Sequence, residues 1–256
     1  MLLAVDVGNT QTVLGLYEGE ELRFTWRIVT NKYDTTDELR IKLSSLLKDD
    51  EVSVKNIRGL ALASVVPRLT ASWMGVSKRM FDKKALVVSA RSAEHVFETN
   101  YANPDEIGAD RVADAVAAVA LYGAPVVVVD FGTATNIEII DKDGIFVGGV
   151  IAPGVETSAA ALFSHAARLG DIELVDPHTA IGQNTSEAVQ AGIVYGEAER
   201  VDGLVRRIFE QLGYDAPVIG TGGLALAVAS SSRSITEVNT ELTLEGLRLI
   251  YASRPK

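Results

Sequence analysis

The same local pattern occurs twice in this chain, in residues 1–15 and again in residues 126–140. In each copy a run of strand-forming residues ends in an aspartate, a glycine follows two positions later, and a small polar turn leads into a second apolar segment. Asp6 and Asp130 are the matching aspartates. The repetition predicts an internal duplication, in which two similar halves face each other and offer two hairpin tips to one cleft.

Each hairpin tip collects groups that bind phosphate. Backbone N–H groups and threonine hydroxyls can donate to phosphate oxygens, and Asp6 can hold a hydrated divalent cation beside them. Taken alone, this hairpin is better explained as an ordinary tight turn with polar residues, because such turn chemistry is common. The second copy favours phosphate binding.

The composition excludes several classes of protein. A chain of 256 residues with 47% hydrophobic content is long and apolar enough for one large domain or two ordinary ones. A formal net charge of -10 argues against nucleic acid as the main partner, since phosphate backbones are bound chiefly by clustered Lys and Arg. The absence of cysteine excludes disulfides, thiolate metal ligands and a cysteine nucleophile, and it fits a reducing cytosol. Because Asp6 interrupts the first apolar run and no run approaches the roughly 20 residues of a membrane helix, we expect a cytoplasmic protein without a signal peptide or membrane contact.

Capping and periodicity predict an α/β chain. The first hairpin is followed by a strand over residues 21–29, a helix capped by Thr35 and Glu38, and a helix that begins at Pro67. The other predicted strands lie at 57–65, 85–89 and 216–219. The predicted helices span residues 67–81, 156–169, 184–212 in broken form and 242–251, and one further helix ends near residue 123. Without a low-complexity linker, the domain boundary is best placed at the second copy, which gives domains of residues 1–122 and 123–256, with the last helix able to pack back on the first domain.

Charged residues gather between the two copies, where a polar loop runs into an Ala-rich helix. Asp105, Glu106 and Asp110 each allow the simple interpretation of helix capping, since the helix dipole favours acidic groups there. Arg111 is different, because a cation in a first helical turn is mildly unfavourable. We therefore expect Arg111 to pair with a carboxylate of the protein or of a ligand.

Two glycine-rich segments and three histidines complete the candidate features. Residues 148–154 can serve turns and close packing, while residues 220–223, between a strand and a helix, form a possible third nucleotide contact. His95, His165 and His178 lack metal-ligand spacing, so we expect them to be structural or exposed.

Four motifs together resemble the type III pantothenate kinases. They are Asp-x-Gly-Asn-Thr at Asp6, Gly-Ala-Asp-Arg at residues 108–111, Asp-Phe-Gly-Thr-Ala-Thr at Asp130 and Asn-Thr at residues 184–185, and their order and spacing match along nearly the whole chain. The resemblance implies duplicated actin-like (ribonuclease H-like) domains of the acetate and sugar kinase, Hsp70 and actin superfamily, with mixed sheets and ATP in an interdomain cleft. It also implies a homodimer and the ATP-dependent phosphorylation of pantothenate to 4'-phosphopantothenate, the first step of coenzyme A biosynthesis.

The resemblance assigns roles to individual residues. The ATP contacts are Asp6, Val7, Gly8, Asn9, Thr10, Gln11, Thr12, Val13 and Thr133. The pantothenate contacts are Tyr101, Gly108, Ala109, Asp110, Arg111 and, from the partner subunit, Thr185. Asp110 matches the catalytic base, and Asp130 resembles the ligand of a monovalent cation, K⁺ or NH4⁺. Mg²⁺ is expected to travel with ATP and to keep several waters, which agrees with the lack of a dense carboxylate cluster.

The residue chemistry agrees with this reaction. Phosphoryl transfer needs positioning and charge stabilisation more than covalent chemistry, and one carboxylate can accept the proton of the attacking alcohol. Arg111 offers a planar fork to the carboxylate of pantothenate. Two rival functions are a non-catalytic relative that binds ligand in the same cleft, and a kinase or phosphatase of the superfamily that acts on a sugar or polyphosphate. Intact Asp6, Asp110 and Arg111 argue against the first, and the Gly-Ala-Asp-Arg motif argues against the second.

Overall fold

The computed structural model describes residues 1–165 and 172–254. Contacts within the chain define two compact units. The first unit combines residues 1–117 with the C-terminal segment from Leu242, and the second runs from Ala118 to Glu241. In the first unit, the strand order is β3-β2-β1-β4-β5, with the first two connections antiparallel and β1, β4 and β5 parallel. These strands are β1 (Leu2–Val7), β2 (Gln11–Glu18), β3 (Glu21–Val29), β4 (Gly59–Ser64) and β5 (Leu86–Val87).

Two amphipathic helices cover one face of the first sheet. α1 (Thr36–Asp49) begins with the predicted capping box between Thr35 and Glu38, and α2 (Pro67–Phe81) begins at its proline. Leu43 of α1 and Trp73 of α2 are buried in one core with side chains of β1, β2 and β4. The predicted positions of both helices are therefore confirmed.

α8 (Leu242–Ala252) packs on the first sheet and against α3 (Ala109–Tyr122). A side chain at Gly59 would collide with Tyr251 of α8, and one at Gly246 would collide with the backbone of Ala113 in α3. Glycine at these two positions lets the helix approach closely. The first unit also contains the short elements η1 (Val54–Asn56), β6 (Glu98–Thr99) and η2 (Pro104–Glu106).

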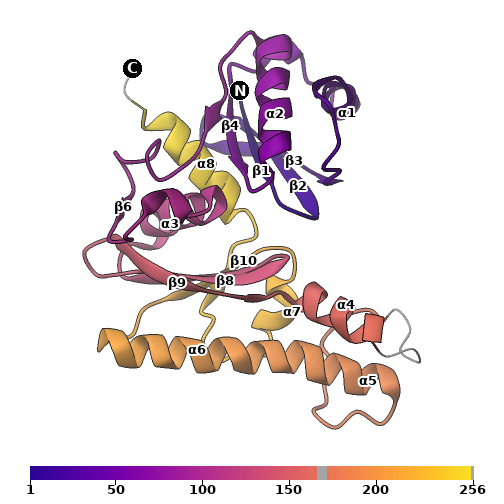
Figure 1. The fold of residues 1–256 in the computed structure, drawn as a ribbon, viewed down its shortest axis with the longest axis vertical. Helices are drawn as coiled ribbons and strands as arrows, with labels where there is room; N and C mark the ends of the chain where they lie inside the picture. Colours follow the sequence, from indigo (N-terminus) through magenta and orange to yellow (C-terminus); the bar gives the residue numbers. More distant parts are fainter. Residues whose placement is uncertain (166–171, 255–256) are drawn as a thin grey trace. The chain divides into compact units, whose positions relative to one another are not determined.

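The second unit repeats the strand arrangement of the first. Its strands β9, β8, β7, β10 and β11 are neighbours in that order, with β7 antiparallel to β8 and parallel to β10. Figure 1 shows β8, β9 and β10 above the long helix α6. Val201 and Val205 of α6 enter a core with Val127 and Ile137 of the sheet. The strands are β7 (Val126–Phe131), β8 (Ala134–Ile140), β9 (Ile145–Pro153), β10 (Val218–Thr221) and β11 (Glu237–Val238). The helices are α4 (Val155–His165), α5 (Thr185–Gln190), the π-helical turn η3 (Ala191–Tyr195), α6 (Gly196–Leu212) and α7 (Ala225–Ala229).

Several predicted boundaries were wrong for identifiable reasons. The strand predicted at 57–65 begins only at Gly59, because the amide of Ile57 closes a 3-10 turn onto Val54. The strand predicted at 85–89 ends early, because Ser89 and Ser92 bond to each other in a turn. The strand predicted at 216–219 lies at Val218–Thr221. The predicted helix at 156–169 is observed as Val155–His165, and its last predicted residues lie outside the described ones. In the described part of the chain, no helix is long and apolar enough to cross a membrane.

Candidate active site

The first hairpin places Asp6 at the end of the central strand of its sheet. Asp6 pairs in register with Val13 of β2 and with Ala63 of the parallel strand β4, and its side chain is half-buried. The turn spans residues 8–11 and is closed by a 3.0 Å hydrogen bond from the Gly8 amide to the Gln11 carbonyl. Ligands of α/β proteins bind at the carboxyl ends of parallel strands, which is where this carboxylate lies.

The underside of this turn is supported by the end of β3. The Thr12 and Thr30 hydroxyls are 2.8 Å apart and hydrogen-bonded, and the Thr30 amide donates to the Thr10 carbonyl at 2.8 Å. Gln11 accepts a hydrogen bond from Arg27 at 3.0 Å. The hairpin tip is thus held by a hydroxyl pair, a backbone bond and the exposed Arg27 side chain.

The polar loop before α3 is ordered by its own contacts. Asn103, not an acidic residue, caps the short helix η2, and the Tyr101 amide donates to the Thr99 hydroxyl at 3.0 Å. Both oxygens of Asp105 accept hydrogen bonds from Arg91 at 2.8 Å. This guanidinium holds the pKa of the Asp105 carboxyl below its usual range. Asp105 is therefore engaged in an ion pair, and helix capping does not describe it.

Asp110 lies in the first turn of α3, folded back over the helix start. Its Oδ1 accepts a 2.9 Å hydrogen bond from the Arg111 amide. A Cβ on Gly108 would come within 2.4 Å of the same oxygen, so only glycine leaves room for this carboxylate. Within residues 1–165 and 172–254, Oδ2 accepts no hydrogen bond. The Arg111 side chain is buried, with 6% exposure.

The second hairpin brings Asp130 against a glycine loop that the sequence analysis treated as a separate contact. Its turn spans residues 132–134 and is closed by a 3.0 Å bond from the Gly132 amide to the Ala134 carbonyl. Gly222 follows β10 with a φ of +91°, and a Cβ there would come within 2.4 Å of Asp130 Oδ1. Both the backbone angle and the close approach require glycine at this position.

A further glycine supports the same turn from below. The Thr133 carbonyl accepts hydrogen bonds from the Gly154 amide at 3.1 Å and from the Thr157 hydroxyl at 2.6 Å. A Cβ on Gly154 would come within 2.3 Å of the Gly132 carbonyl oxygen. The last glycine of the 148–154 segment therefore serves close packing against the turn.

Sequence reasoning missed a buried polar cluster beside this hairpin. The Thr135 hydroxyl donates to Glu197 Oε1 at 2.6 Å, and Glu197 also pairs with Arg200, one turn further along α6. Arg200 Nη2 donates to the Pro153 carbonyl at 2.7 Å. No short motif marks these residues, and the only available signal was a Glu and an Arg three positions apart on a predicted helix.

Thr185 begins α5 in a different part of the second unit. Asn184 accepts the Glu187 amide at 3.0 Å, but Glu187 bonds to the Gln183 amide, so the capping motif is not fully reciprocal. The preceding loop is attached to α5 by Gln190, which donates to the Glu173 carbonyl, and to η3 by Tyr195, which donates to Asp176. The His178 amide and the Tyr195 hydroxyl together lower the pKa of Asp176.

The structure thus groups the candidate residues within each unit. Asp6 to Val13, Tyr101 and residues 108–111 belong to the first unit, while Asp130, Thr133 and Thr185 belong to the second. Among the described residues, no cluster of three or more His, Cys, Asp or Glu could hold a metal ion. His95 bonds to Ser253, and His178 is exposed beside Asp176.

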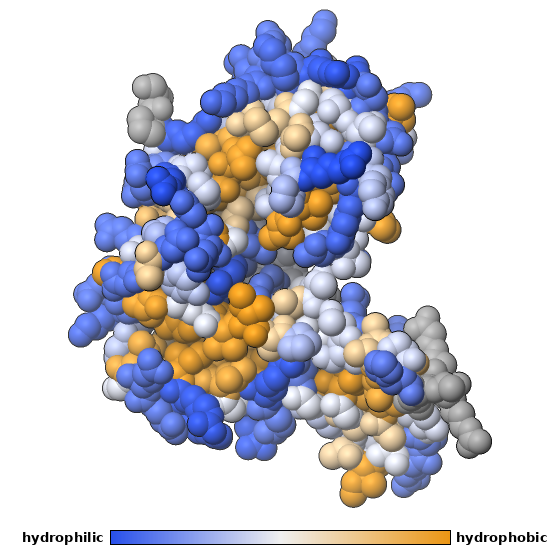
Figure 2. Space-filling model, in the orientation of Figure 1, coloured by the Kyte–Doolittle hydropathy of each residue, from blue (hydrophilic) through white to orange (hydrophobic). Residues whose placement is uncertain are grey.

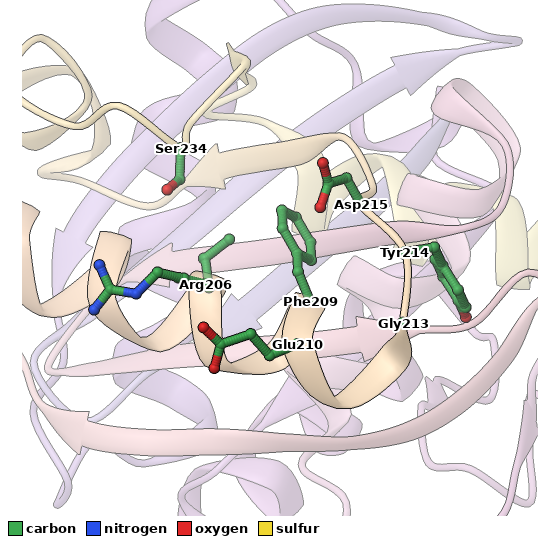
Figure 3. A pocket seen from close by; sticks show the side chains of 8 residues that line it. Arg206, Phe209, Glu210, Gly213, Tyr214, Asp215 and Ser234 are labelled. Atoms are coloured by element: carbon green, nitrogen blue, oxygen red, sulfur yellow. The ribbon is translucent and has the colours of Figure 1, made fainter.

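An open hollow of about 520 Å³ lies away from these candidates, at the end of α6. Figure 3 shows Arg206, Phe209 and Glu210 extending from this helix beside Tyr214 and Asp215 of the following turn. None of the residues lining the hollow is a predicted site residue.

Solved structures with low sequence identity share this fold. Component A of (R)-2-hydroxyglutaryl-CoA dehydratase from Acidaminococcus fermentans matches with a TM-score of 0.56 at 15% identity, covering 98% of this chain and 96% of that one. A ROK hexokinase from Thermus thermophilus matches with a TM-score of 0.53 at 13% identity, covering 97% of each chain. The α/β architecture with two mixed sheets is that of duplicated actin-like domains.

Sequence comparison identifies the family. Residues 2–207 match the family model for type III pantothenate kinase. The type III pantothenate kinase of Thermomicrobium roseum is 44% identical over 251 residues, covering 98% of this chain and 96% of the relative. That of an Exiguobacterium species is 43% identical over 256 residues, covering 100% of both. The chain belongs to the type III pantothenate kinase family, whose members use ATP to phosphorylate an alcohol group of pantothenate in coenzyme A biosynthesis.

Proposed function

We propose that Asp110 is the general base of this kinase. The proposal depends on the position of the Asp110 carboxylate. Its Oδ1 accepts a hydrogen bond from the Arg111 amide and occupies space that a side chain at residue 108 would fill. Its Oδ2 accepts no hydrogen bond from the described residues. A carboxylate fixed at one oxygen can present the other to a substrate hydroxyl. A well-placed base contributes on the order of 100-fold to 10,000-fold to the rate.

Pantothenate binds beside this base in our proposal. The Arg111 guanidinium pairs with the pantothenate carboxylate, and Tyr101, Gly108 and Ala109 form the adjoining wall. A buried guanidinium favours such pairing, because a planar fork in a partly dry environment binds a carboxylate strongly and with defined orientation.

We propose ATP contacts at residues 6–13 in the first unit and at Thr133 in the second. Amides and hydroxyls at small turns suit phosphate oxygens, and the half-buried Asp6 at the end of β1 suits a hydrated cation. A Mg²⁺ ion bound with ATP supplies charge neutralisation of the phosphates. Asp6 would hold it through water, which fits the absence of a carboxylate cluster among the described residues.

Asp130 is the proposed ligand of a monovalent cation, K⁺ or NH4⁺. Its Oδ1 and the Phe131 carbonyl both lie against Gly222, so a carboxylate and a backbone carbonyl converge where glycine leaves space. Oxygen donors of this kind suit a hard cation.

In the reaction, the pantothenate hydroxyl oxygen attacks the γ-phosphorus of ATP. The bond from this phosphorus to the bridging oxygen of the β-phosphate breaks, ADP departs with that electron pair, and the hydroxyl proton passes to Asp110. The hairpin tips orient the phosphates and Arg111 orients the acceptor, so most of the rate enhancement comes from positioning and electrostatics.

A homodimer completes the proposal, with Thr185 reaching the pantothenate site of the partner subunit. Exposed apolar residues on the second unit support an interface: Ile151 is 67% exposed and Ile181 is 81% exposed. Figure 2 shows apolar side chains at the α4–α5 end of this unit. We assign the enzyme to the cytoplasm, where ATP is available.

The test compares Asp110→Asn with Asp105→Asn. Both remove a carboxylate from the same segment, but Asp105 pairs with Arg91 and has no proposed catalytic role. With ATP, Mg²⁺, K⁺ and pantothenate, Asp110→Asn should lose about 100-fold or more in kcat, whereas Asp105→Asn should keep wild-type turnover. Circular dichroism should show both variants folded. Wild-type-like turnover by Asp110→Asn would refute the assignment of the base.

A further inference from the structure

Thr12 and Thr135 occupy the same place in the two hairpins. Each is the first ladder residue after its turn, Thr12 opposite Val7 and Thr135 opposite Phe131, and each is 2% exposed. Thr12 bonds to the neutral hydroxyl of Thr30, but Thr135 bonds to the carboxylate of Glu197. Among the described residues, an ion pair therefore supports the second turn at this position, whereas the matching threonine of the first turn bonds to a neutral hydroxyl.

Stability alone is a poor reason for this difference. Glu197 is 5% exposed, and its partner Arg200 is mostly covered. Taking such a pair out of water costs about as much as the ion pair returns, and well-packed apolar residues often serve stability equally well. A buried pair does fix geometry, because each charged group must keep its partners.

The Glu197–Arg200 pair is connected by hydrogen bonds to the Gly132–Thr133 turn. Arg200 donates to the Pro153 carbonyl, and the next residue, Gly154, donates to the Thr133 carbonyl. A Cβ at Gly154 would collide with the Gly132 carbonyl oxygen. On the other side, Glu197 holds the Thr135 hydroxyl, two residues after Thr133. Side chains of α6 therefore contact the segments on both sides of the Gly132–Thr133 turn.

We propose that Glu197 and Arg200 are positioning residues for ATP, acting through Thr135 and Pro153 to hold the Gly132–Thr133 turn in its phosphate-binding conformation. The inference rests on the proposed ATP contact of Thr133. Neither charged side chain needs to touch ATP. Their loss should let the turn shift relative to the phosphates, and displacements of about 1 Å in a positioned group can cost up to about 100-fold in activity.

The experiment measures KM for ATP, KM for pantothenate, kcat and melting temperature in four variants. Glu197→Gln and Arg200→Ala break the ion pair, Thr135→Val removes the hydroxyl, and Thr135→Ser retains it. The first three should raise KM for ATP about tenfold, with little change in KM for pantothenate, and Thr135→Ser should behave like wild type. Arg207→Ala is the matched control, because Arg207 is exposed on the same helix.

Thr133→Ala separates failure of the inference from failure of its premise. If Thr133→Ala leaves KM for ATP unchanged, the ATP contact itself is wrong. If Thr133→Ala raises KM for ATP but the three disruptive variants do not, the positioning role is overturned. Equal effects on both substrates, or a lower melting temperature with unchanged KM for ATP, would also overturn it. Should Glu197→Gln fail to fold, Thr135→Val against Thr135→Ser gives the same decision.

Discussion

The two hairpins are built on the same strand order but are supported differently. In the first unit, β1 lies between antiparallel β2 and parallel β4, and in the second, β7 lies between antiparallel β8 and parallel β10. The first turn, residues 8–11, is supported by the Thr12–Thr30 hydroxyl pair, a backbone bond from Thr30 and an exposed hydrogen bond from Arg27. The second turn, residues 132–134, is shorter and is supported by Gly154, Gly222 and a buried ion pair.

The same strand arrangement can therefore support its turn in two different ways. The first turn depends on local strand bonds, so its side chains can change with limited effect on the fold. The second turn depends on close backbone approach from two other segments, Gly154 and Gly222, which leaves no volume for substitution. Variants at matching positions of the two hairpins should therefore distinguish effects on activity from effects on stability.

The largest effect should come from Asp6→Asn compared with Asp130→Asn. If Asp6 faces the Mg²⁺ bound with ATP as proposed, Asp6→Asn removes that charge, and kcat/KM should fall by about 100-fold or more in either K⁺ or Na⁺. Asp130→Asn should lower activity several-fold and abolish the difference between K⁺ and Na⁺. Steady-state assays in the two salts test both. An Asp130→Asn enzyme that still prefers K⁺ would break the proposed division between the hairpins.

Glycine-to-alanine variants in the two hairpins should differ in their free energy of unfolding. Gly154→Ala places a Cβ within 2.3 Å of backbone, so it should cost about 1–3 kcal/mol in free energy of unfolding. At Gly8 the nearest atom is 3.0 Å away, and the Gln11 carbonyl can yield slightly, so Gly8→Ala should cost less. Urea denaturation measures both. The comparison fails if Gly8→Ala is the more destabilising variant.

Helix caps allow a smaller comparison between the units. Thr35 and Glu38 form a complete capping box at α1, whereas Asn184 makes a one-way cap at α5. Thr35→Ala should cost about 1 kcal/mol, and Asn184→Ala should cost a similar or smaller amount. Thermal unfolding followed by circular dichroism provides the measurement, with Thr35→Ser as a control that keeps the hydroxyl. Wild-type stability of Thr35→Ala would show that α1 is held by packing alone.

The smallest effect is a pH dependence of the second unit. Burial raises the pKa of Asp202, but hydrogen bonds from Ser232, the Arg233 amide and Ser234 outweigh it and leave the pKa below its ordinary value. Because the folded pKa lies below the unfolded one, this contribution is fully present above about pH 4 and is lost as pH falls through the folded pKa.

Asp202→Asn should therefore flatten the acid side of the stability curve compared with wild type. Chemical denaturation at a series of acidic pH values measures this difference. Glu210→Gln, which neutralises an exposed carboxylate on the same helix, is the matched control. Parallel curves for wild type and Asp202→Asn would contradict the prediction.

Much of the fold could be predicted because its signals are local. Both hairpins, the capping box at Thr35 and the helix that begins at Pro67 are confirmed at the predicted positions. The family motifs also identified the enzyme class, which the comparisons confirm. Boundaries failed where a side chain or 3-10 turn ended a strand, as at Ser89, since such contacts leave no periodic trace. The roles of the individual site residues stay predictions.

The sequence by itself therefore predicted the two hairpins, most of the helices and the enzyme family, because these signals lie in neighbouring residues. It missed the strand β9, whose glycines at 148–149 read as turn residues. Only the tertiary structure placed Gly222 against Asp130 and Glu197 beside Thr135. These contacts join segments far apart in the chain, and they form only where close packing brings the segments together. That is why the buried threonine of one hairpin bonds to a hydroxyl and that of its copy to a carboxylate.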